Sequence, residues 1–340
     1  MTATRSRRPR LGFLGTGWIG RHRLETIAAS GVAEIAAVVD PVPANADAAM
    51  ASAPRAARLP SLDALLEAEL DGIVIATPSA LHAEQTVAAL RHGLAVFCQK
   101  PLGRTAAETA QAVDAAKVAD RLLGVDLSYR HTAAACRVRE LVLGGALGTV
   151  YAADLVFHNA YGPDKPWFYD PALSGGGCVI DLGIHLVDLA LWTLDFPIVS
   201  GISARLFAGG TPIEEPGAAI EDYAVATLDL EPGAVARLAC SWNLSAGWDA
   251  VITAEFFGTR GSAALRNVNG SFYDFTGSEA HGTARTMLVE PPDAWGGRAA
   301  VAWARQLAED PGYDQEADRL VELAVAIDAI YGRKAAVAAA

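Results

Sequence analysis

A glycine-rich turn near the start of the chain constrains the fold more than any other feature. Gly15-Thr16-Gly17-Trp18-Ile19-Gly20 follows a short apolar run at residues 10–15 and precedes a segment with helical spacing at residues 18–30. The first glycine permits a tight turn, the second leaves room for a close neighbour, and the third lets the helix approach the strand. The sequence therefore predicts a strand, a tight turn and a helix in immediate succession.

Strand and helix patterns then alternate through residue 127. Buried strands are expected at 34–40, 72–76, 94–98 and 122–127, and helices at 44–53, 80–92 and 105–121, with a further helix opening at Ser61. Ser61 and Ser79 are candidate helix caps, and Gly31 and Gly93 are candidate helix ends. Helices of this length between strands indicate a parallel sheet, which binds ligands beyond the carboxyl ends of its strands. Residues 1–127 are thus expected to form an α/β Rossmann domain, with residues 1–9 as a disordered basic tail.

The pattern changes after residue 127, and residues 128–340 are expected to form an α+β domain with a largely antiparallel open sheet. Consecutive strands are separated by short turns, which favours antiparallel pairing. The expected strands are 149–158, 198–207, 224–230, 234–242, 251–257 and 262–266, and the expected helices are 133–143, 183–194 and 314–331.

The glycine-rich turn and Asp40 together indicate a dinucleotide site. Asp40 ends the second predicted strand, where a carboxylate can bind the ribose 2′-hydroxyl of NAD. Pro41-Val42-Pro43 offers no cation for a 2′-phosphate, so NAD is favoured and NADP stays an alternative. The other reading of the glycines is a tight turn without a ligand.

Asp181, His185 and Asp188 carry the second chemical signal. They lie at i, i+4 and i+7 of a predicted helix that follows a glycine triplet, so they share one face. Histidine can take a proton from a hydroxyl group, and an aspartate within reach can orient it. The alternatives are a structural hydrogen bond and a metal site, and the spacing of the remaining His and Cys residues predicts no metal.

Lys100 follows the strand at 94–98, at the edge where the cofactor is expected. A lysine in this place can hold a hydroxyl oxygen and stabilise a developing alkoxide. The alternative is an exposed surface lysine, which is the usual environment of this residue.

Several motifs taken together resemble those of the glucose–fructose oxidoreductase/inositol dehydrogenase (Gfo/Idh/MocA) family. They are the glycine-rich turn, Ala76-Thr77-Pro78-Ser79-Ala80-Leu81-His82, Phe97-Cys98-Gln99-Lys100-Pro101-Leu102, and the glycine triplet before Asp181 and His185. The resemblance implies catalytic roles for Lys100, Asp181 and His185. It also implies that the cofactor is bordered by Thr77, Pro78, His82 and Gln99 in addition to the turn and Asp40. The family's Glu before the lysine is Gln99 here.

Further residues are candidates for the substrate pocket. Tyr129, Arg130, His158, Asn159, Trp167 and Asp188 stand near these motifs in the chain. An indole such as Trp167 can stack on a pyranose ring, and Arg130 can hold a phosphate or a carboxylate. The alternative for each is loop packing or solvent exposure.

These observations predict an enzyme that oxidises a secondary hydroxyl, or reduces the ketone, of a sugar, nucleotide-sugar or cyclitol. Two rival functions are an NAD-dependent glycosidase acting by transient oxidation and elimination, and a non-catalytic NAD-binding regulatory protein. The resemblance also implies a homodimer or homotetramer.

The charge and the cysteines bear on partners and location. Lys+Arg 27 against Asp+Glu 39 gives a net charge of −12, which disfavours nucleic-acid and anionic-membrane partners. Four cysteines without a paired spacing favour a reduced cytoplasmic protein. Ser6-Arg7-Arg8 resembles an export signal, but cleavage after the apolar run would remove the expected cofactor site. No stretch is expected to span a membrane.

Overall fold

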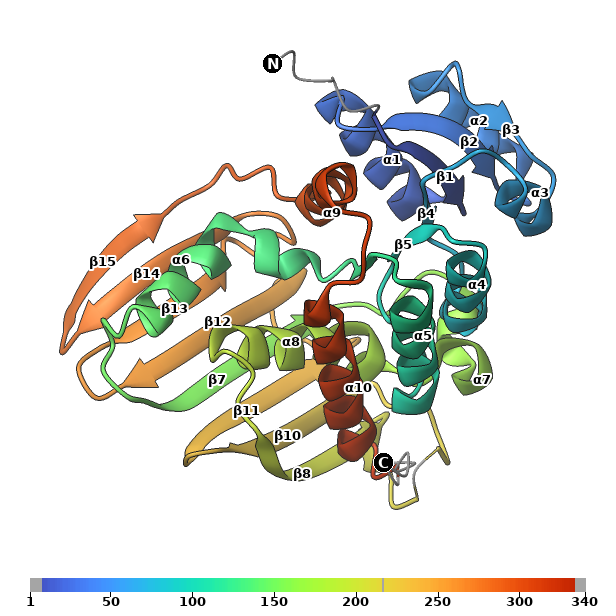
Figure 1. Cartoon of the computed structure of the whole chain (residues 1–340). Coiled ribbons are helices and arrows are strands. Elements are labelled where there is room, and N and C mark those ends of the chain that lie inside the picture. The colour runs from blue at the N-terminus through green and yellow to red at the C-terminus, as the bar shows by residue number, and fades with distance from the viewer. Residues whose placement is uncertain (1–7, 216, 334–340) are drawn as a thin grey trace, which may run out of the picture. The chain divides into compact units, whose positions relative to one another are not determined.

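The computed structural model describes residues 8–215 and 217–333, and these residues form two compact units (Figure 1). Of the described residues, the first unit contains 8–103, 107–126 and 296–321, and the second contains 104–106, 127–215, 217–295 and 322–333. The sequence places a boundary at residue 127 but does not anticipate the C-terminal segment in the first unit. Residues 1–7 of the expected N-terminal tail lie outside the described residues.

The first unit contains a six-stranded parallel sheet with strand order β3-β2-β1-β4-β5-β6. Its strands are β1 (Arg10–Leu14), β2 (Glu34–Val39), β3 (Ala57–Arg58), β4 (Gly72–Ile75), β5 (Ala95–Cys98) and β6 (Leu123–Val125). Its helices are α1 (Trp18–Ser30), α2 (Pro43–Ser52), α3 (Leu62–Leu66), α4 (Ser79–Arg91), α5 (Ala106–Ala119), α9 (Arg298–Glu309) and the 3₁₀ turn η4 (Gln315–Asp318). This arrangement confirms the predicted parallel α/β sheet.

One face of this sheet is covered by α1, α2 and α9, which share a hydrophobic core with alternate residues of the strands. Trp303 of α9 packs on Phe97 with ring centroids 5.6 Å apart. Glycines make room for its indole: a Cβ atom at Gly72 would lie 2.9 Å from it, and one at Gly124 would lie 2.8 Å from it. A helix from near the C-terminus therefore completes the core of the N-terminal sheet.

The second unit contains a nine-stranded sheet with strand order β15-β14-β13-β12-β7-β11-β10-β8-β9. Its pairs are antiparallel except for β7 and β11, which run parallel. The strands are β7 (Val150–Asn159), β8 (Val199–Ala208), β9 (Thr211–Pro212), β10 (Tyr223–Leu230), β11 (Ala234–Ser241), β12 (Ala250–Gly258), β13 (Ser262–Asn267), β14 (Phe275–His281) and β15 (Ala284–Val289). This confirms the predicted α+β class.

Two helices of the second unit pack on its sheet: α6 (Ala133–Leu143) on β13 and β14, and α8 (Ile184–Thr193) on β7, β11 and β12 (Figure 1). A π-helical turn, η3 (Val179–Gly183), leads directly into α8. The remaining elements are η1 (Ser128–His131), η2 (Pro166–Tyr169), α7 (Pro171–Ser174) and α10 (Arg319–Ile330).

Several sequence expectations need correction. Ser61 caps its helix, with its Oγ accepting from the Ala64 N–H at 3.2 Å, but Ser79 does not cap α4, since the helix begins at Ser79 and Pro78 holds the cap position. The expected helix at 314–331 is divided into η4 and α10, and α9, β14 and β15 are not anticipated. The segment of α9 is strongly amphipathic, so its helical signal was present in the sequence and was missed. The segments of β14 and β15 mix polar and apolar residues without a clear alternation, so packing decides these strands.

The expectation that no stretch of the chain could span a membrane is wrong by the criteria of length and composition. The helical stretch Pro171–Thr193 is long and apolar enough to cross a membrane by length and composition, with a mean hydropathy of 1.4. In the structure 83% of its most apolar window is buried inside the protein. A burial of this kind is typical of a core helix.

Candidate active site and cofactor site

The glycine-rich turn leaves the start of α1 open. Gly15 has φ +85°, and a Cβ atom there would lie 2.6 Å from the carbonyl oxygen of Ala76. A Cβ atom at Gly20 would lie 2.1 Å from the carbonyl oxygen of Gly15, whereas one at Gly17 would meet nothing within 4 Å. No side chain among the described residues caps α1. Free N–H groups, the positive end of the helix dipole and open space at Gly17 fit a pyrophosphate.

Asp40 is tied to this turn. Its Oδ2 atom accepts from the N–H of Thr16 at 2.6 Å, and its Oδ1 atom accepts from the N–H of Val42 at 2.8 Å. These bonds hold the carboxylate beside the glycines at the end of β2, as the ribose role requires. Trp18 is exposed on the first turn of α1 with its ring stacked on His22, and Ile19 is partly exposed.

The loop after β4 is fixed by a buried histidine. Nδ1 of His82 lies 2.7 Å from the carbonyl oxygen of Pro101, and Nε2 lies 2.7 Å from that of Thr77. Burial lowers the pKa of His82, which opposes the effect of the two carbonyl hydrogen bonds. Thr77 also donates its hydroxyl to Gln85 at 2.6 Å, and Pro78 precedes α4. His82 therefore joins two loops of the expected cofactor edge, and its ring nitrogens are both engaged by protein.

Gln99 holds the peptide that leads into Lys100. Its Oε1 atom accepts from the Lys100 N–H at 3.0 Å, and its Nε2 atom donates to Asp126 at 3.0 Å. Asp126 is fully buried and forms an ion pair with Arg23 at 2.6 Å. Asp126 was not singled out from the sequence. It places a negative charge beside Gln99, where the resembling family carries the charge on a glutamate.

Asp181 lies in the π-helical turn before α8. Its Oδ2 atom accepts from Nε1 of Trp242 at 3.1 Å. Trp242 is buried, and its indole fixes the orientation of Asp181. The Trp242 ring is held in turn by an edge contact with Tyr169 at 5.6 Å between centroids.

His185 lies one turn further along, in the first turn of α8, among aromatic rings. Its ring contacts that of Tyr129 edge-on at 4.8 Å and that of Phe157 at 6.3 Å. Tyr129 is itself buried, and burial raises the pKa of its hydroxyl. Tyr129, a predicted substrate residue, therefore lies directly against the predicted base.

Asp188, one further turn along, is paired with Arg130. Nε of Arg130 lies 2.9 Å from both carboxylate oxygens, and the guanidinium packs over the rings of Trp192 and Phe196. The carboxylate is almost fully buried. A bidentate buried pair of this kind is better explained as a support of α8 than as a pair of substrate contacts.

His158 and Asn159 are the last two residues of β7 and point to opposite faces of the sheet, so only Asn159 shares the face of Phe157, whose ring contacts His185. Nδ1 of His158 lies 2.7 Å from the hydroxyl of Ser241, its ring stacks on Tyr223, and burial lowers its pKa. The Oδ1 atom of Asn159 is buried without a hydrogen-bond partner in the described part of the chain. A buried acceptor without a donor is costly, and a hydroxyl group of a ligand would satisfy it.

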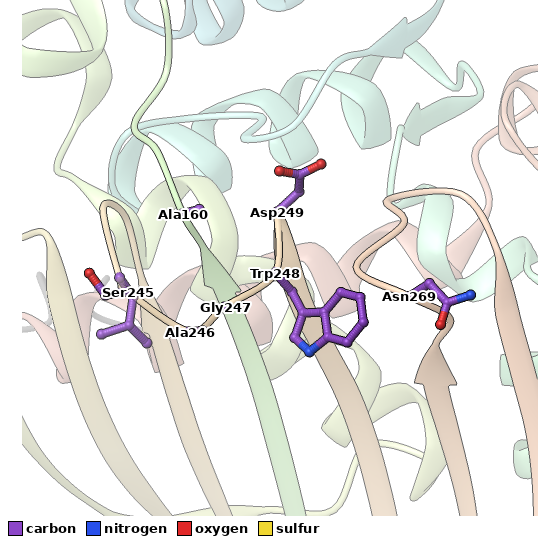
Figure 2. Close-up of a pocket in the computed structure, with 8 residues that line it drawn as sticks. Ala160, Ser245, Ala246, Gly247, Trp248, Asp249 and Asn269 are labelled. Atoms are coloured by element: carbon purple, nitrogen blue, oxygen red, sulfur yellow. The ribbon is translucent and has the colours of Figure 1, made fainter.

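An open pocket of about 450 Å³ lies at this end of the sheet, between β7, β12 and the loops that precede β12 and follow β13 (Figure 2). It is lined by Ala160, Leu244, Ser245, Ala246, Gly247, Trp248, Asp249 and Asn269. Trp248 is 54% exposed, and Gly270 approaches its side chain closely. Trp167, by contrast, has one face covered by Phe168, with centroids 3.8 Å apart.

The structure thus groups the predicted residues by unit. The glycine turn, Asp40, the Thr77–His82 loop and Gln99–Lys100 belong to the first unit, and Tyr129, His158, Asn159, Asp181 and His185 belong to the second. Sequence reasoning missed Asp126, Trp248, Asp249 and Asn269. No motif marks them, although Gly247-Trp248 in the turn between two expected strands was a usable signal.

Known families match both halves of the chain. Residues 10–127 match the oxidoreductase family with an NAD-binding Rossmann fold, and residues 136–264 match the GFO/IDH/MocA C-terminal domain. The first unit therefore carries an NAD-binding Rossmann domain.

Two curated relatives are dehydrogenases named for an inositol and a glucoside. The chain is 30% identical over 302 residues to inositol 2-dehydrogenase 3 of Saccharopolyspora erythraea, which covers 88% of this chain and 82% of that protein. It is 28% identical over 211 residues to D-glucoside 3-dehydrogenase of Escherichia coli K12, which covers 59% of this chain and only 60% of that protein.

Solved structures share the fold over nearly the whole chain. GenD2 from gentamicin A biosynthesis, in complex with NAD, aligns with a TM-score of 0.79 at 23% identity over 96% of this chain and 93% of that one. Levoglucosan dehydrogenase with NADH and levoglucosan aligns with a TM-score of 0.80 at 20% identity over 96% of this chain and 97% of that one. From the family matches and the inositol dehydrogenase relative, the chain belongs to the Gfo/Idh/MocA family of NAD-binding oxidoreductases.

Proposed function

We propose that the protein is an NAD-dependent dehydrogenase that interconverts a secondary hydroxyl and a ketone on a sugar, a nucleotide-sugar or a cyclitol. The observation that carries the proposal is in the second unit: Asp181 and His185 stand on successive turns of one helix, at the sheet end where Asn159 and the open pocket lie. The names of the relatives, which act on inositol and glucosides, support this substrate class.

The proposed chemistry divides among three side chains. When bound at the glycine-rich turn, the nicotinamide cofactor would supply a hydride acceptor for oxidation and a hydride donor for reduction. His185 takes the hydroxyl proton, and Asp181, itself held by Trp242, orients the imidazole and stabilises its charged form. Lys100 stabilises the developing alkoxide by a charge-assisted hydrogen bond, and Gln99 fixes the peptide that carries it.

The preference for NAD follows from Asp40. Its carboxylate is fixed at the end of β2 by the Thr16 and Val42 N–H groups, where it would repel a 2′-phosphate. Asp40→Ala is expected to weaken NAD binding. It should therefore lower the ratio of the dissociation constant for NADP to that for NAD. Fluorescence titration with both cofactors measures this ratio, and an unchanged ratio would contradict the assignment.

The pocket supports a polyol rather than an apolar substrate. Trp248 offers an exposed indole face, and Asp249 and Asn269 supply polar groups nearby (Figure 2). Aromatic faces paired with hydrogen-bonding groups suit the two kinds of surface on a sugar ring. Trp248→Ala is expected to raise KM for the alcohol by about tenfold, a loss of about 1.4 kcal/mol, with kcat and KM for NAD little changed.

A substrate screen tests the function itself. Inositols, free pyranoses and nucleotide-sugars are incubated with the protein and NAD, and NADH absorbance is followed. Lys100→Met, Asp181→Asn and His185→Gln are each expected to lower kcat by about a hundredfold or more while NAD still binds. Absence of turnover across the panel would contradict the proposal. Release of a sugar without net NADH would instead indicate oxidation–elimination of a glycoside.

A double variant tests whether the two units serve one reaction. If Lys100 and His185 act on the same carbinol, Lys100→Met combined with His185→Gln should cost far less than the sum of the two single losses. Additive losses would show that the two groups do not act together.

We also infer a cytoplasmic homo-oligomer. All four cysteines are free thiols, and Cys136 is exposed, which suits a reducing compartment. Val156, Val225 and Thr253 lie half-buried on the outward face of the nine-stranded sheet, among ion pairs such as Arg237–Asp154. We infer that this face packs against a second copy of the chain. Light scattering on the purified protein should give the mass of a dimer or tetramer, and a monomer would overturn this inference.

A further inference from the structure

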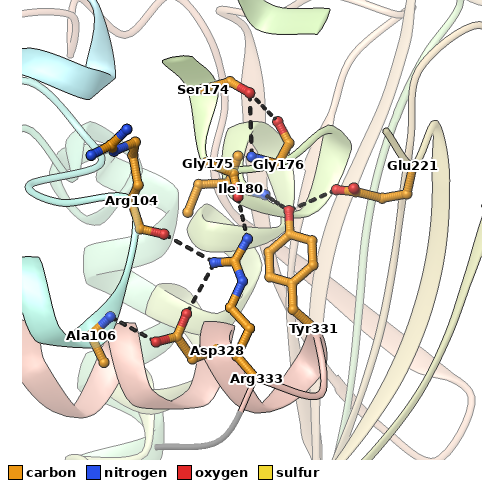
Figure 3. Close-up of polar contacts among 10 residues, drawn as sticks. All are labelled: Arg104, Ala106, Ser174, Gly175, Gly176, Ile180, Glu221, Asp328, Tyr331 and Arg333. Atoms are coloured by element: carbon orange, nitrogen blue, oxygen red, sulfur yellow. Dashed lines mark hydrogen bonds and ion pairs between the residues drawn. The ribbon is translucent and has the colours of Figure 1, made fainter. Parts of the chain in front are cut away.

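The start of the helix that carries Asp181 and His185 is capped by residues distant in the chain (Figure 3). Glu221 accepts with Oε1 from the N–H groups of Gly177 at 2.8 Å and Val179 at 2.9 Å. Its backbone carbonyl accepts from the N–H of Cys178 at 3.0 Å. The fourth N–H, of Ile180, donates to the hydroxyl of Tyr331 at 3.1 Å. All four N–H groups that a helix start leaves without partners are thus satisfied.

Glu221 and Tyr331 also bind each other. The Tyr331 hydroxyl donates to Oε1 of Glu221 at 2.7 Å, so one carboxylate oxygen accepts three hydrogen bonds. Glu221 is only 2% exposed. Burial raises the pKa of Glu221, and the hydrogen bonds from Tyr331, Val179 and Gly177 oppose that effect. A carboxylate at the positive end of a helix is also stabilised by the dipole.

The glycine triplet is explained by this cap. A Cβ atom at Gly176 would lie 2.1 Å from the Tyr331 hydroxyl, and one at Gly177 would lie 2.0 Å from the carbonyl oxygen of Glu221. At these two glycines the space of a side chain is taken by the Tyr331 hydroxyl and the Glu221 carbonyl, whereas among the described residues nothing occupies it at Gly17. The triplet therefore serves the position of the helix.

A second layer fixes Tyr331. Arg333 donates to the carbonyl oxygen of Gly175, and to that of Arg104 at 3.0 Å, and forms an ion pair with Asp328 at 3.0 Å. Asp328 in turn accepts from the N–H of Ala106 at 2.8 Å. The C-terminal segment is thereby attached to the first residue of the triplet as well as to the helix start.

We propose that Glu221 and Tyr331 are positioning residues that set the register of the π-helical turn and of α8, and so the placement of Asp181 and His185. The inference rests on the proposed function for its catalytic consequence. Asp181 is one residue past the last capped N–H group, and its own N–H donates to the Gly177 carbonyl. A small shift at the cap is therefore transmitted directly to both side chains, and misplacements of this size are costly in catalysis.

Two conservative variants test the proposal. Tyr331→Phe keeps the ring and removes the hydroxyl, and Glu221→Gln keeps the shape and removes the charge. Leu265→Ala is the control, because Leu265 is buried in β13 of the same unit and has no part in the cap. For each full-length variant, the melting temperature, the hydrogen exchange of the amides at 177–180, the NMR ring resonance of His185 and the kinetics are measured. His185→Gln assigns the resonance.

The expected result separates positioning from stability. Tyr331→Phe and Glu221→Gln should speed exchange at 177–180, move the His185 resonance and lower kcat by about tenfold, with the dissociation constant for NAD unchanged. A larger deuterium isotope effect at the oxidised carbon should accompany the slower hydride step. Leu265→Ala should lower the melting temperature without these effects.

Two outcomes would overturn the proposal. One is a His185 resonance that does not move in either cap variant, and the other is a kcat that falls no more than in Leu265→Ala at equal stability. A wild-type protein that turns over no alcohol would contradict the proposed function. In that case the exchange and resonance measurements still decide whether the cap holds Asp181 and His185 in place.

Discussion

Gln99 illustrates how one residue's role depends on its neighbours. In isolation, glutamine before Lys100 removes a negative charge from the site. In the structure Asp126 restores one, because its buried carboxylate accepts from the Gln99 amide and pairs with Arg23. The amide is therefore locked with its oxygen toward the Lys100 N–H.

A charge exchange between these two positions tests this arrangement. Gln99→Glu alone places a second, half-buried carboxylate against Asp126, and we expect it to lower the free energy of unfolding by about 2 kcal/mol. Adding Asp126→Asn gives the new glutamate a hydrogen-bond donor again. The loss of unfolding free energy in the double variant should therefore be smaller than the sum of the two single losses by about 1 kcal/mol or more. Urea denaturation of all four proteins measures the coupling. Strict additivity would show that the two side chains do not interact.

His82 predicts a specific dependence of stability on pH. Burial holds its pKa below 6.5, so the unfolded chain binds the proton more readily than the folded protein. Stability is then present above pH 6.5 and is lost as the pH falls below it, with a slope of at most about 1.4 kcal/mol per pH unit. His82→Gln cannot titrate, so its disadvantage relative to the wild type should shrink between pH 7 and pH 5. A constant difference over this range would contradict the assignment.

At the scale of elements, two helices begin after glycines and use them differently. Within residues 8–215 and 217–333, no side chain caps the start of α1 and none lies close to Gly17, which suits a phosphate. The start of the helix with Asp181 is closed by Glu221 and Tyr331. The glycine-rich segments before the two helices look alike because a side chain is excluded at both. A bound ligand needs the space before α1, whereas protein groups occupy it before the helix with Asp181.

Gly176→Ala should show this difference. Gly176 has φ +157°, and a Cβ atom there would collide with the Tyr331 hydroxyl, so we expect a loss of about 3 kcal/mol in the free energy of unfolding together with a lower kcat. Gly145→Ala is the matched control, because Gly145 has φ +68° and nothing within 4 Å of its added Cβ. It should cost only about 1 kcal/mol and leave kcat unchanged. Equal losses of unfolding free energy in the two variants would show that the close contact between Gly176 and Tyr331 does not decide the outcome.

At the scale of the whole molecule, the first unit is not continuous in sequence. Its core is completed by α9, whose Trp303 fills the space above Gly72 and Gly124. A fragment ending at residue 127 would leave this apolar face uncovered. The order of elements along the chain thus differs from their grouping in space.

Substitutions of Trp303 test how much α9 contributes to the stability of the first unit. Trp303→Ala should lower the free energy of unfolding by about 3–5 kcal/mol, as expected for a large buried ring. Trp303→Phe should lower the free energy of unfolding clearly less. It keeps an aromatic ring, and it removes a buried Nε1–H that has no hydrogen-bond partner among the described residues and is therefore unfavourable. Calorimetry of the two variants gives the comparison. A loss below about 1 kcal/mol for the alanine variant would show that α9 is not part of this core.

The sequence alone determined the features that depend on neighbouring residues. The parallel sheet, the glycine turn at Gly15, and the placing of Asp181 and His185 on one helix follow from strand and helix periods and from backbone freedom, which are local properties. Lys100, Asp181 and His185 were identified from motifs of a few residues, and their catalytic roles stay predictions. Only the tertiary structure decided which distant groups meet: Glu221 with Gly177, Asp126 with Gln99, and Trp303 with the N-terminal sheet. The reason is that each buried polar group and each cavity must be satisfied by whatever the fold brings near, and no short pattern in the chain records that partner.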